Sequence, residues 1–236
     1  MSTSTEEYLE GIRFGFHVTS LYSARSLRFV ASHLHHTGMM PFADFFTAFR
    51  RYSQANSGSL YNHYIEGIIA RNNQGGHSVL GGLLHFVLHL ARQEFDKTLF
   101  EFMRSLQWWD DERVRFLFEL DLLNRPYVYL NTRIAVPRHL SLVSILGEDA
   151  GGFRVLVPPS YYAEACRLLM LDQEDGVARP LSVQYRTTQY PYMKGKDFEQ
   201  NFLYCNEKLH KMNSVLPVWK TESVARTTAE RVSLSV

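Results

Sequence analysis

Two histidines at a four-residue spacing are the first candidates for chemistry in this sequence. His85 and His89 belong to the run His-Phe-Val-Leu-His, and a helix would place both imidazoles on one face. Two such imidazoles can bind one metal ion, with a third ligand from His63, His77 or Glu94. No glutamate follows the first histidine, so the metalloprotease pattern is missing. The simpler interpretation is a pair of half-buried histidines that hydrogen-bond to neighbouring helices.

The densest group of aromatic and basic residues lies between residues 185 and 196. It includes Tyr185, Arg186, Tyr190, Tyr192 and Lys194. Such side chains can bind a peptide, a nucleotide or a ring-shaped cofactor through stacking and charge. A long structured loop between a strand and a helix has the same composition, and that interpretation stays open. We expect these residues to contact a ligand or partner, and the sequence predicts no bound cofactor.

The other candidate motifs are incomplete. Gly81-Gly82 is followed by two leucines, whereas a phosphate-binding loop needs Lys and then Ser or Thr. Glu119 and Asp121 stand two residues apart on a predicted helix and therefore point to different faces. We expect each of these carboxylates to be solvated or paired with Arg115 or Arg125.

Composition excludes several classes of protein. The chain has 236 residues, of which 45% are hydrophobic and 21% are charged, which is typical of a globular protein. Its formal net charge of +1 does not favour a nucleic-acid partner. The two cysteines, Cys166 and Cys205, form no disulfide framework or metal motif. We expect a cytoplasmic protein without a membrane span, because the most apolar stretch, residues 79–91, is short and contains two histidines.

Hydrophobic periodicity predicts a mainly α fold. Helices are expected over residues 5–35, 42–53, 60–71, 78–93, 95–106 and 110–125, followed by helices at 161–171 and 198–212. Short runs of β-branched and aromatic residues predict strands at 127–130, 153–157 and 181–187. The sequence therefore predicts a multi-helix region over residues 1–125 packed with a smaller α+β region over 126–220, and a flexible tail over 221–236. One continuous domain is the alternative.

Several segments resemble the helical C-terminal region of cobalamin-binding radical SAM proteins. They are residues 7–14, 41–46 and 118–123, and near the end of the chain Tyr190-Pro191-Tyr192, Tyr204-Cys205 and Pro217-Val218-Trp219. The family's cluster motif C-x-x-x-C-x-x-C and its cobalamin motif D-x-H-x-x-G are absent, so no functional residue carries over. The resemblance implies a detached C-terminal domain that serves a separate radical SAM-type modifying enzyme, or binds a substrate or peptide by itself.

Three functions follow from these observations. The leading hypothesis is a non-catalytic accessory domain that binds a protein or peptide partner, or a substrate. The first alternative is a helical metal-dependent enzyme that uses His85 and His89, which predicts stoichiometric metal. The second alternative is a structural protein that assembles into homo-oligomers.

Overall fold

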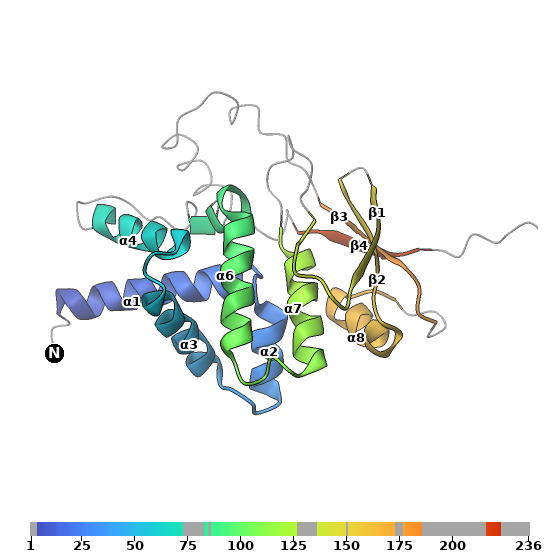
Figure 1. Cartoon of the computed structure of the whole chain (residues 1–236), viewed down its shortest axis with the longest axis horizontal. Helices are drawn as coiled ribbons and strands as arrows, with labels where there is room; N and C mark the ends of the chain where they lie inside the picture. Colours follow the sequence, from blue (N-terminus) through green and yellow to red (C-terminus); the bar gives the residue numbers. More distant parts are fainter. Residues whose placement is uncertain are drawn as a thin grey trace, which may run out of the picture.

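The computed structural model describes residues 4–72, 83–84, 86–126, 136–149, 151–172, 177–185 and 216–222. The helices of the first half are α1 (Thr5–Val18), the π-helix η1 (Thr19–Ser23), α2 (Arg28–His36), α3 (Phe42–Ala55), α4 (Leu60–Asn72), the π-helix η2 (Phe86–Leu90), α6 (Arg92–Ser105) and α7 (Glu112–Asn124). The second half contains β1 (Ser144–Asp149), β2 (Gly152–Leu156), α8 (Pro159–Leu169), β3 (Leu181–Gln184) and β4 (Val218–Thr221). The prediction of a mainly α fold with a smaller α+β region is confirmed (Figure 1).

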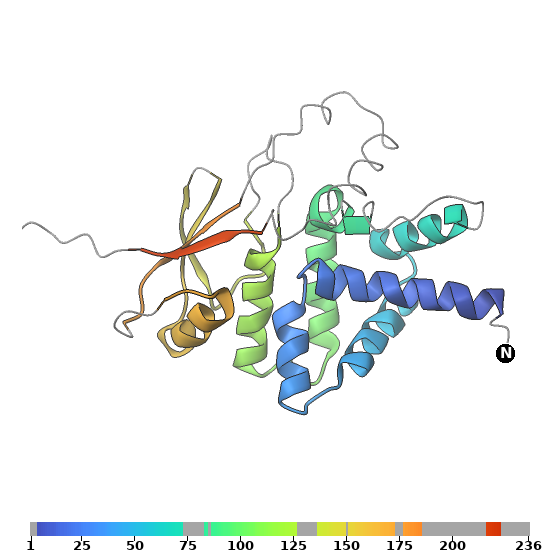
Figure 2. The same cartoon turned by 180° about the vertical axis from the view of Figure 1, so that it is seen from behind.

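The first predicted helix, over residues 5–35, is wrong because the chain turns in its middle. α1 begins with a capping box, in which Glu7 N–H donates to Ser4 Oγ and Ser4 N–H donates to the Glu7 carboxylate. After η1, Arg25 adopts a left-handed φ of 57°, and α2 runs steeply across the direction of α1 (Figure 2). The turn buries Leu21, Leu27 and Val30 completely. In one straight helix these apolar residues would lie on several faces, and each face would have to pack against another element to leave water.

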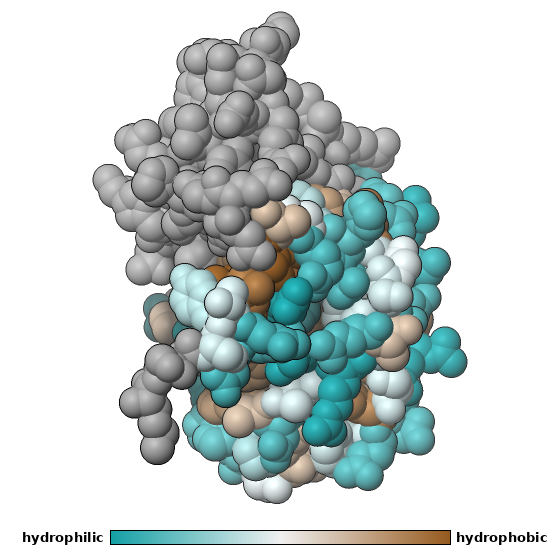
Figure 3. Space-filling view, turned by 90° about the vertical axis from the view of Figure 1, so that its left-hand side faces the viewer, coloured by the Kyte–Doolittle hydropathy of each residue, from teal (hydrophilic) through white to brown (hydrophobic). Residues whose placement is uncertain are grey.

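Aromatic rings fill the core between α1, α3, α4 and α6. Phe49 and Phe102 meet edge to face at 5.0 Å, and Tyr61 stacks on Phe95 at 4.9 Å. His17 lies among them with its Nδ1 atom 3.0 Å from the Tyr61 hydroxyl. Burial lowers the pKa of His17 to about 4, so its imidazole is neutral at pH 7. The outer face of these N-terminal helices is mainly hydrophilic, with a small apolar group near its middle (Figure 3).

Helix α7 is buried on all sides after its first turn. Its N-cap is Asp111, whose carboxylate accepts the Arg113 N–H at 2.8 Å, so the helix begins two residues later than the predicted start at 110. Every residue from 116 to 124 is buried. The helix lies between α2 and α6 on one side and α8 with the sheet on the other (Figure 1). It therefore joins the helical region to the α+β region.

The two carboxylates of α7 are buried, which corrects the expectation that Glu119 and Asp121 are solvated or paired with arginine. Asp121 accepts the Phe29 N–H at 2.9 and 3.0 Å and the Val30 N–H at 3.1 Å. These donors lie in the first turn of α2, which has no side-chain cap of its own. Glu119 accepts the backbone N–H groups of residues 141, 142 and 143 at distances of 2.7 to 3.1 Å. Their spacing on α7 thus lets one carboxylate hold α2 and the other hold the segment that leads into β1.

The antiparallel sheet has the strand order β1-β2-β3-β4 and also attaches to α7. The Tyr185 hydroxyl, directly after β3, donates to the Leu123 carbonyl at 2.7 Å, and Trp219 Nε1 on β4 donates to Asn124 Oδ1 at 3.0 Å. Gly152 allows β2 and β3 to approach, because a Cβ atom there would lie 1.8 Å from the Val183 carbonyl oxygen. Both hydrogen bonds end at the last turn of α7, so the sheet is fixed to that helix by side chains.

Several predicted elements are confirmed and others differ. The strands expected at 153–157 and 181–187 correspond to β2 and β3, whereas β1 and β4 were not predicted. Residues 147–152 contain the end of β1 and the turn of a hairpin that leads into β2. The predicted strand 127–130, helix 198–212 and most of the tail 221–236 lie outside the described residues. Within the described chain, no helix is both long and apolar enough to cross a bilayer.

The buried Asp121 predicts an unusual dependence of stability on pH. Burial raises the pKa of Asp121 to about 8 against the opposing effect of the α2 amides, whereas the ordinary value is 3.8. The native protein then keeps a proton that the unfolded chain releases, so its stability should fall as the pH rises from about 4 to about 8. The expected slope from this group is about 1.4 kcal/mol per pH unit. Urea unfolding should be measured for the wild type and for Asp121→Asn across this pH range. The free energy of unfolding of the wild type minus that of the variant should fall by about 1.4 kcal/mol per pH unit as the pH rises.

The exposed Asp44, in the first turn of α3, provides the control for this measurement. Asp44→Asn should keep the wild-type dependence of stability on pH. A constant difference between wild type and Asp121→Asn at every pH would contradict a proton held by Asp121.

Loss of the Glu119 carboxylate should destabilise the fold. Glu119→Ala would leave three backbone N–H groups without their acceptor, and we expect the free energy of unfolding to fall by about 2 to 3 kcal/mol. Glu112→Ala, at the exposed start of the same helix, should cost less than about 1 kcal/mol. Urea unfolding at constant pH measures both losses. Equal losses for the two variants would show that the amides at 141–143 do not depend on Glu119.

Candidate functional site

The aromatic–basic stretch provides one described residue, and that residue belongs to the core. Tyr185 is 4% exposed, packs edge to face on Phe153 and donates its hydroxyl proton to α7. Its expected role as a contact residue is corrected, because a ring inside the core presents no surface to a partner. Four other predicted contact residues lie outside the part of the chain that the structure describes: Arg186, Tyr190, Tyr192 and Lys194.

The predicted metal ligands are also beyond the described side chains. His85 lies outside the described residues, and His89 lies in η2 with a side chain that is not described. Among the side chains that the structure does describe, no three His, Cys, Asp or Glu residues are grouped to hold a metal ion. The hypothesis of a histidine metal site therefore stays a prediction.

A pocket of about 560 Å³ lies between α6, α7 and the segment that leads into β1. We call it the arginine pocket. Its lining comes from three separate stretches of the chain, and its residues are Phe100, Arg104, Trp109, Arg115, Glu119, Arg138, His139, Leu140, Ser141 and Leu142. A volume of this size is typical of small-ligand sites.

Positive charge dominates the arginine pocket. Arg104 comes from the last turn of α6, Arg115 from the first half of α7 and Arg138 from the segment before β1. None of the three forms an ion pair with a carboxylate of the described residues, whereas arginines such as Arg113 and Arg154 face glutamates. A guanidinium stays charged at every physiological pH. The pocket therefore offers three fixed cations that no described carboxylate neutralises.

The one carboxylate in the pocket is already used. Glu119 directs both oxygens at the backbone N–H groups of residues 141–143 and also accepts the Ser141 hydroxyl at 2.8 Å. These hydrogen bonds hold the negative charge at the base of the pocket and fix the chain that carries Arg138 and His139. Glu119 thus fixes residues 141–143 beside the pocket and forms no ion pair with the three arginines, which can bind another anion.

Aromatic rings also line the pocket. The His139 ring stacks on Phe100 at 4.2 Å with an interplanar angle of 11°, and Trp109 meets Phe100 edge to face at 5.5 Å. The Arg104 guanidinium carbon lies 5.7 Å from the centre of the Phe100 ring. Burial and the neighbouring Arg138 lower the pKa of His139, so its imidazole is neutral at pH 7. An apolar wall beside fixed cations suits a ligand with a carbon part and an anionic part.

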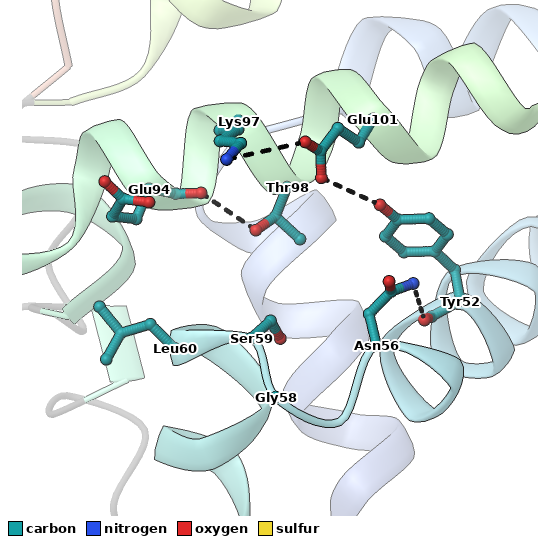
Figure 4. Close-up of a pocket in the computed structure, with 9 residues that line it drawn as sticks. All are labelled: Tyr52, Asn56, Gly58, Ser59, Leu60, Glu94, Lys97, Thr98 and Glu101. Carbon is teal, nitrogen blue, oxygen red and sulfur yellow. Dashed lines mark hydrogen bonds and ion pairs between the residues drawn. The ribbon is translucent and has the colours of Figure 1, made fainter.

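A second pocket, of about 380 Å³, lies between α6 and the α3–α4 turn (Figure 4). Its polar groups already bind one another. The Tyr52 hydroxyl donates to the Glu101 carboxylate at 3.4 Å, Lys97 lies 3.9 Å from the same carboxylate, and the Thr98 hydroxyl donates to the Glu94 carbonyl at 3.0 Å. We therefore take the arginine pocket, whose cations pair with no described carboxylate, as the candidate site.

Sequence reasoning missed the arginine pocket. No local motif joins Phe100, Arg115 and Arg138, since they are brought together only by the packing of α6, α7 and the segment before β1. The available signals were the pair Trp108-Trp109 and the pair Arg138-His139, each of which places two large functional side chains next to each other in a predicted connection.

Comparison with known proteins provides no relative for this chain. No family model matches the sequence, and no curated protein or solved structure shows significant similarity to it.

Proposed function

We propose that this chain is a non-catalytic binding domain that holds an anionic group of a partner or substrate in the arginine pocket. The observation that carries this proposal is the set of three arginines without a described carboxylate partner. Guanidinium groups supply charge and directed N–H donors, but they do not exchange protons at neutral pH. Such a set is suited to holding a ligand rather than to transferring its protons.

The partner that we propose is a protein or peptide. The resemblance of several segments to the C-terminal region of radical SAM proteins supports a modifying enzyme of that class as the partner. We also propose a cytoplasmic location, which is supported by the low cysteine content and by Cys166, a buried free thiol.

Binding of simple anions tests the proposed site. Citrate, inorganic phosphate and a glutamate-rich peptide should each be titrated into the ¹⁵N-labelled full chain and followed by NMR. We expect at least one of them to shift the Trp109 indole N–H and the backbone amides of residues 138–142, which line the arginine pocket. Arg115→Gln should weaken that binding about tenfold, because a charge-assisted hydrogen bond contributes about 1.5 to 3 kcal/mol.

An arginine elsewhere on the surface provides the matched control. Arg51 is exposed on α3, away from the pocket, and Arg51→Gln should bind the anion as the wild type does. Equal weakening by both substitutions would indicate general charge attraction. No shift of the pocket resonances by any of the three anions would contradict the proposed function.

A further inference from the structure

We propose that the group recognised by the arginine pocket is the dianion of a phosphate monoester, rather than a carboxylate. This inference rests on the proposed function, since it names the chemical class of the anion that the same pocket binds. Two features of the pocket carry it, namely the number of its cations and the three separate elements that supply them.

The first feature is the balance of charge. Arg104, Arg115 and Arg138 bring three positive charges to one pocket, and Glu119, the only described carboxylate in its lining, offsets one of them, so an excess of two positive charges remains. A carboxylate ligand has one negative charge and leaves most of the repulsion among the arginines in place. A phosphate monoester has a charge of about −1.5 to −2 at pH 7 and neutralises more of it.

The second feature is geometry. The three arginines belong to the end of α6, to α7 and to the segment before β1, so they reach the pocket from three elements. A carboxylate offers two oxygens in one plane, which suits a single guanidinium fork. A phosphate monoester offers three acceptor oxygens around a tetrahedral phosphorus, which suits donors from three directions.

The aromatic wall indicates what the ester carries. Phe100, Trp109 and His139 lie beside the arginines and form apolar contact surface. A free phosphate ion would leave this surface in water, whereas a ring or another apolar group on the ester oxygen would cover it. The preferred ligand is thus a phosphate ester with a ring, presented either by a small molecule or by a phosphorylated side chain of a partner.

The charge of the whole chain argues for a single phosphate group rather than a polyanion. The formal net charge is only +1, so the excess of positive charge in the pocket is local. Nucleic acids and anionic membranes are bound by extended basic surfaces. One compact pocket with three arginines matches one phosphate group.

Calorimetric titration of the full chain at pH 8 with four probes tests this inference. Phenyl phosphate, phenyl sulfate and benzoate share one ring and differ in the charge and shape of the anion, whereas inorganic phosphate lacks the ring. We expect phenyl phosphate to bind at least about tenfold more tightly than phenyl sulfate or benzoate, because at pH 8 it carries one more negative charge than either of them. It also offers three acceptor oxygens where benzoate offers two. Inorganic phosphate should bind more weakly than phenyl phosphate, since it does not cover the aromatic wall.

Single substitutions assign the effect to the pocket. Arg138→Gln and Arg104→Gln change exposed side chains, so each variant should fold as the wild type does and lose about tenfold in affinity for phenyl phosphate. Arg51→Gln should retain wild-type affinity. A phosphotyrosine peptide distinguishes the two sources of the ester. Tighter binding than phenyl phosphate would identify a phosphorylated partner, and equal binding would identify a small-molecule ester.

The outcomes separate this inference from the proposed function. Benzoate or phenyl sulfate binding as tightly as phenyl phosphate would overturn the phosphate assignment and leave an anion-binding domain. Unchanged affinity in both Arg138→Gln and Arg104→Gln would overturn the assignment to this pocket. Absence of binding by all four probes, together with no response to citrate or to a glutamate-rich peptide, would overturn both proposals.

Discussion

The backbone amides at the start of α2 and in the segment before β1 lack acceptors in their own elements, and a single helix supplies both. Asp121 accepts from Phe29 and Val30, and Glu119 accepts from residues 141–143. Buried amides without acceptors would cost about as much as the net stability of a weak domain. The position of α7 therefore determines where α2 and the beginning of the sheet lie.

The other polar groups around α7 extend the same arrangement. Arg125 forms a buried ion pair with Asp96, and Arg92 donates to the carbonyls of Leu88 and Pro126 at 3.2 and 2.9 Å. The sheet attaches through Tyr185 and Trp219 at the C-terminal end of the helix. Because residues 116–124 of α7 are buried on every face, the helical and α+β regions share one core rather than meeting at a surface.

The arrangement around α7 also explains the charge of the candidate site. The arginines near the end of α7, Arg92 and Arg125, are buried and bound to protein acceptors, whereas Arg104, Arg115 and Arg138 line a pocket open to ligands. Glu119 carries the one described negative charge in the lining of that pocket, and its hydrogen bonds to backbone amides hold it without an ion pair to the three arginines. Because Glu119 binds backbone amides, the three neighbouring arginines remain available to bind an anionic ligand.

The sequence by itself determined the local elements. The helix that became α3 and the strands that became β2 and β3 were predicted from the pattern of residue types within each segment. Only the tertiary structure decided the turn near Arg25, the burial of Glu119 and Asp121, and the convergence of the three pocket arginines. Each of these features depends on residues that are far apart in the chain. The Val30 N–H, for example, donates to Asp121, which lies 91 residues later. Periodicity along one segment cannot indicate which distant backbone amide or side chain will complete it, because packing decides that pairing.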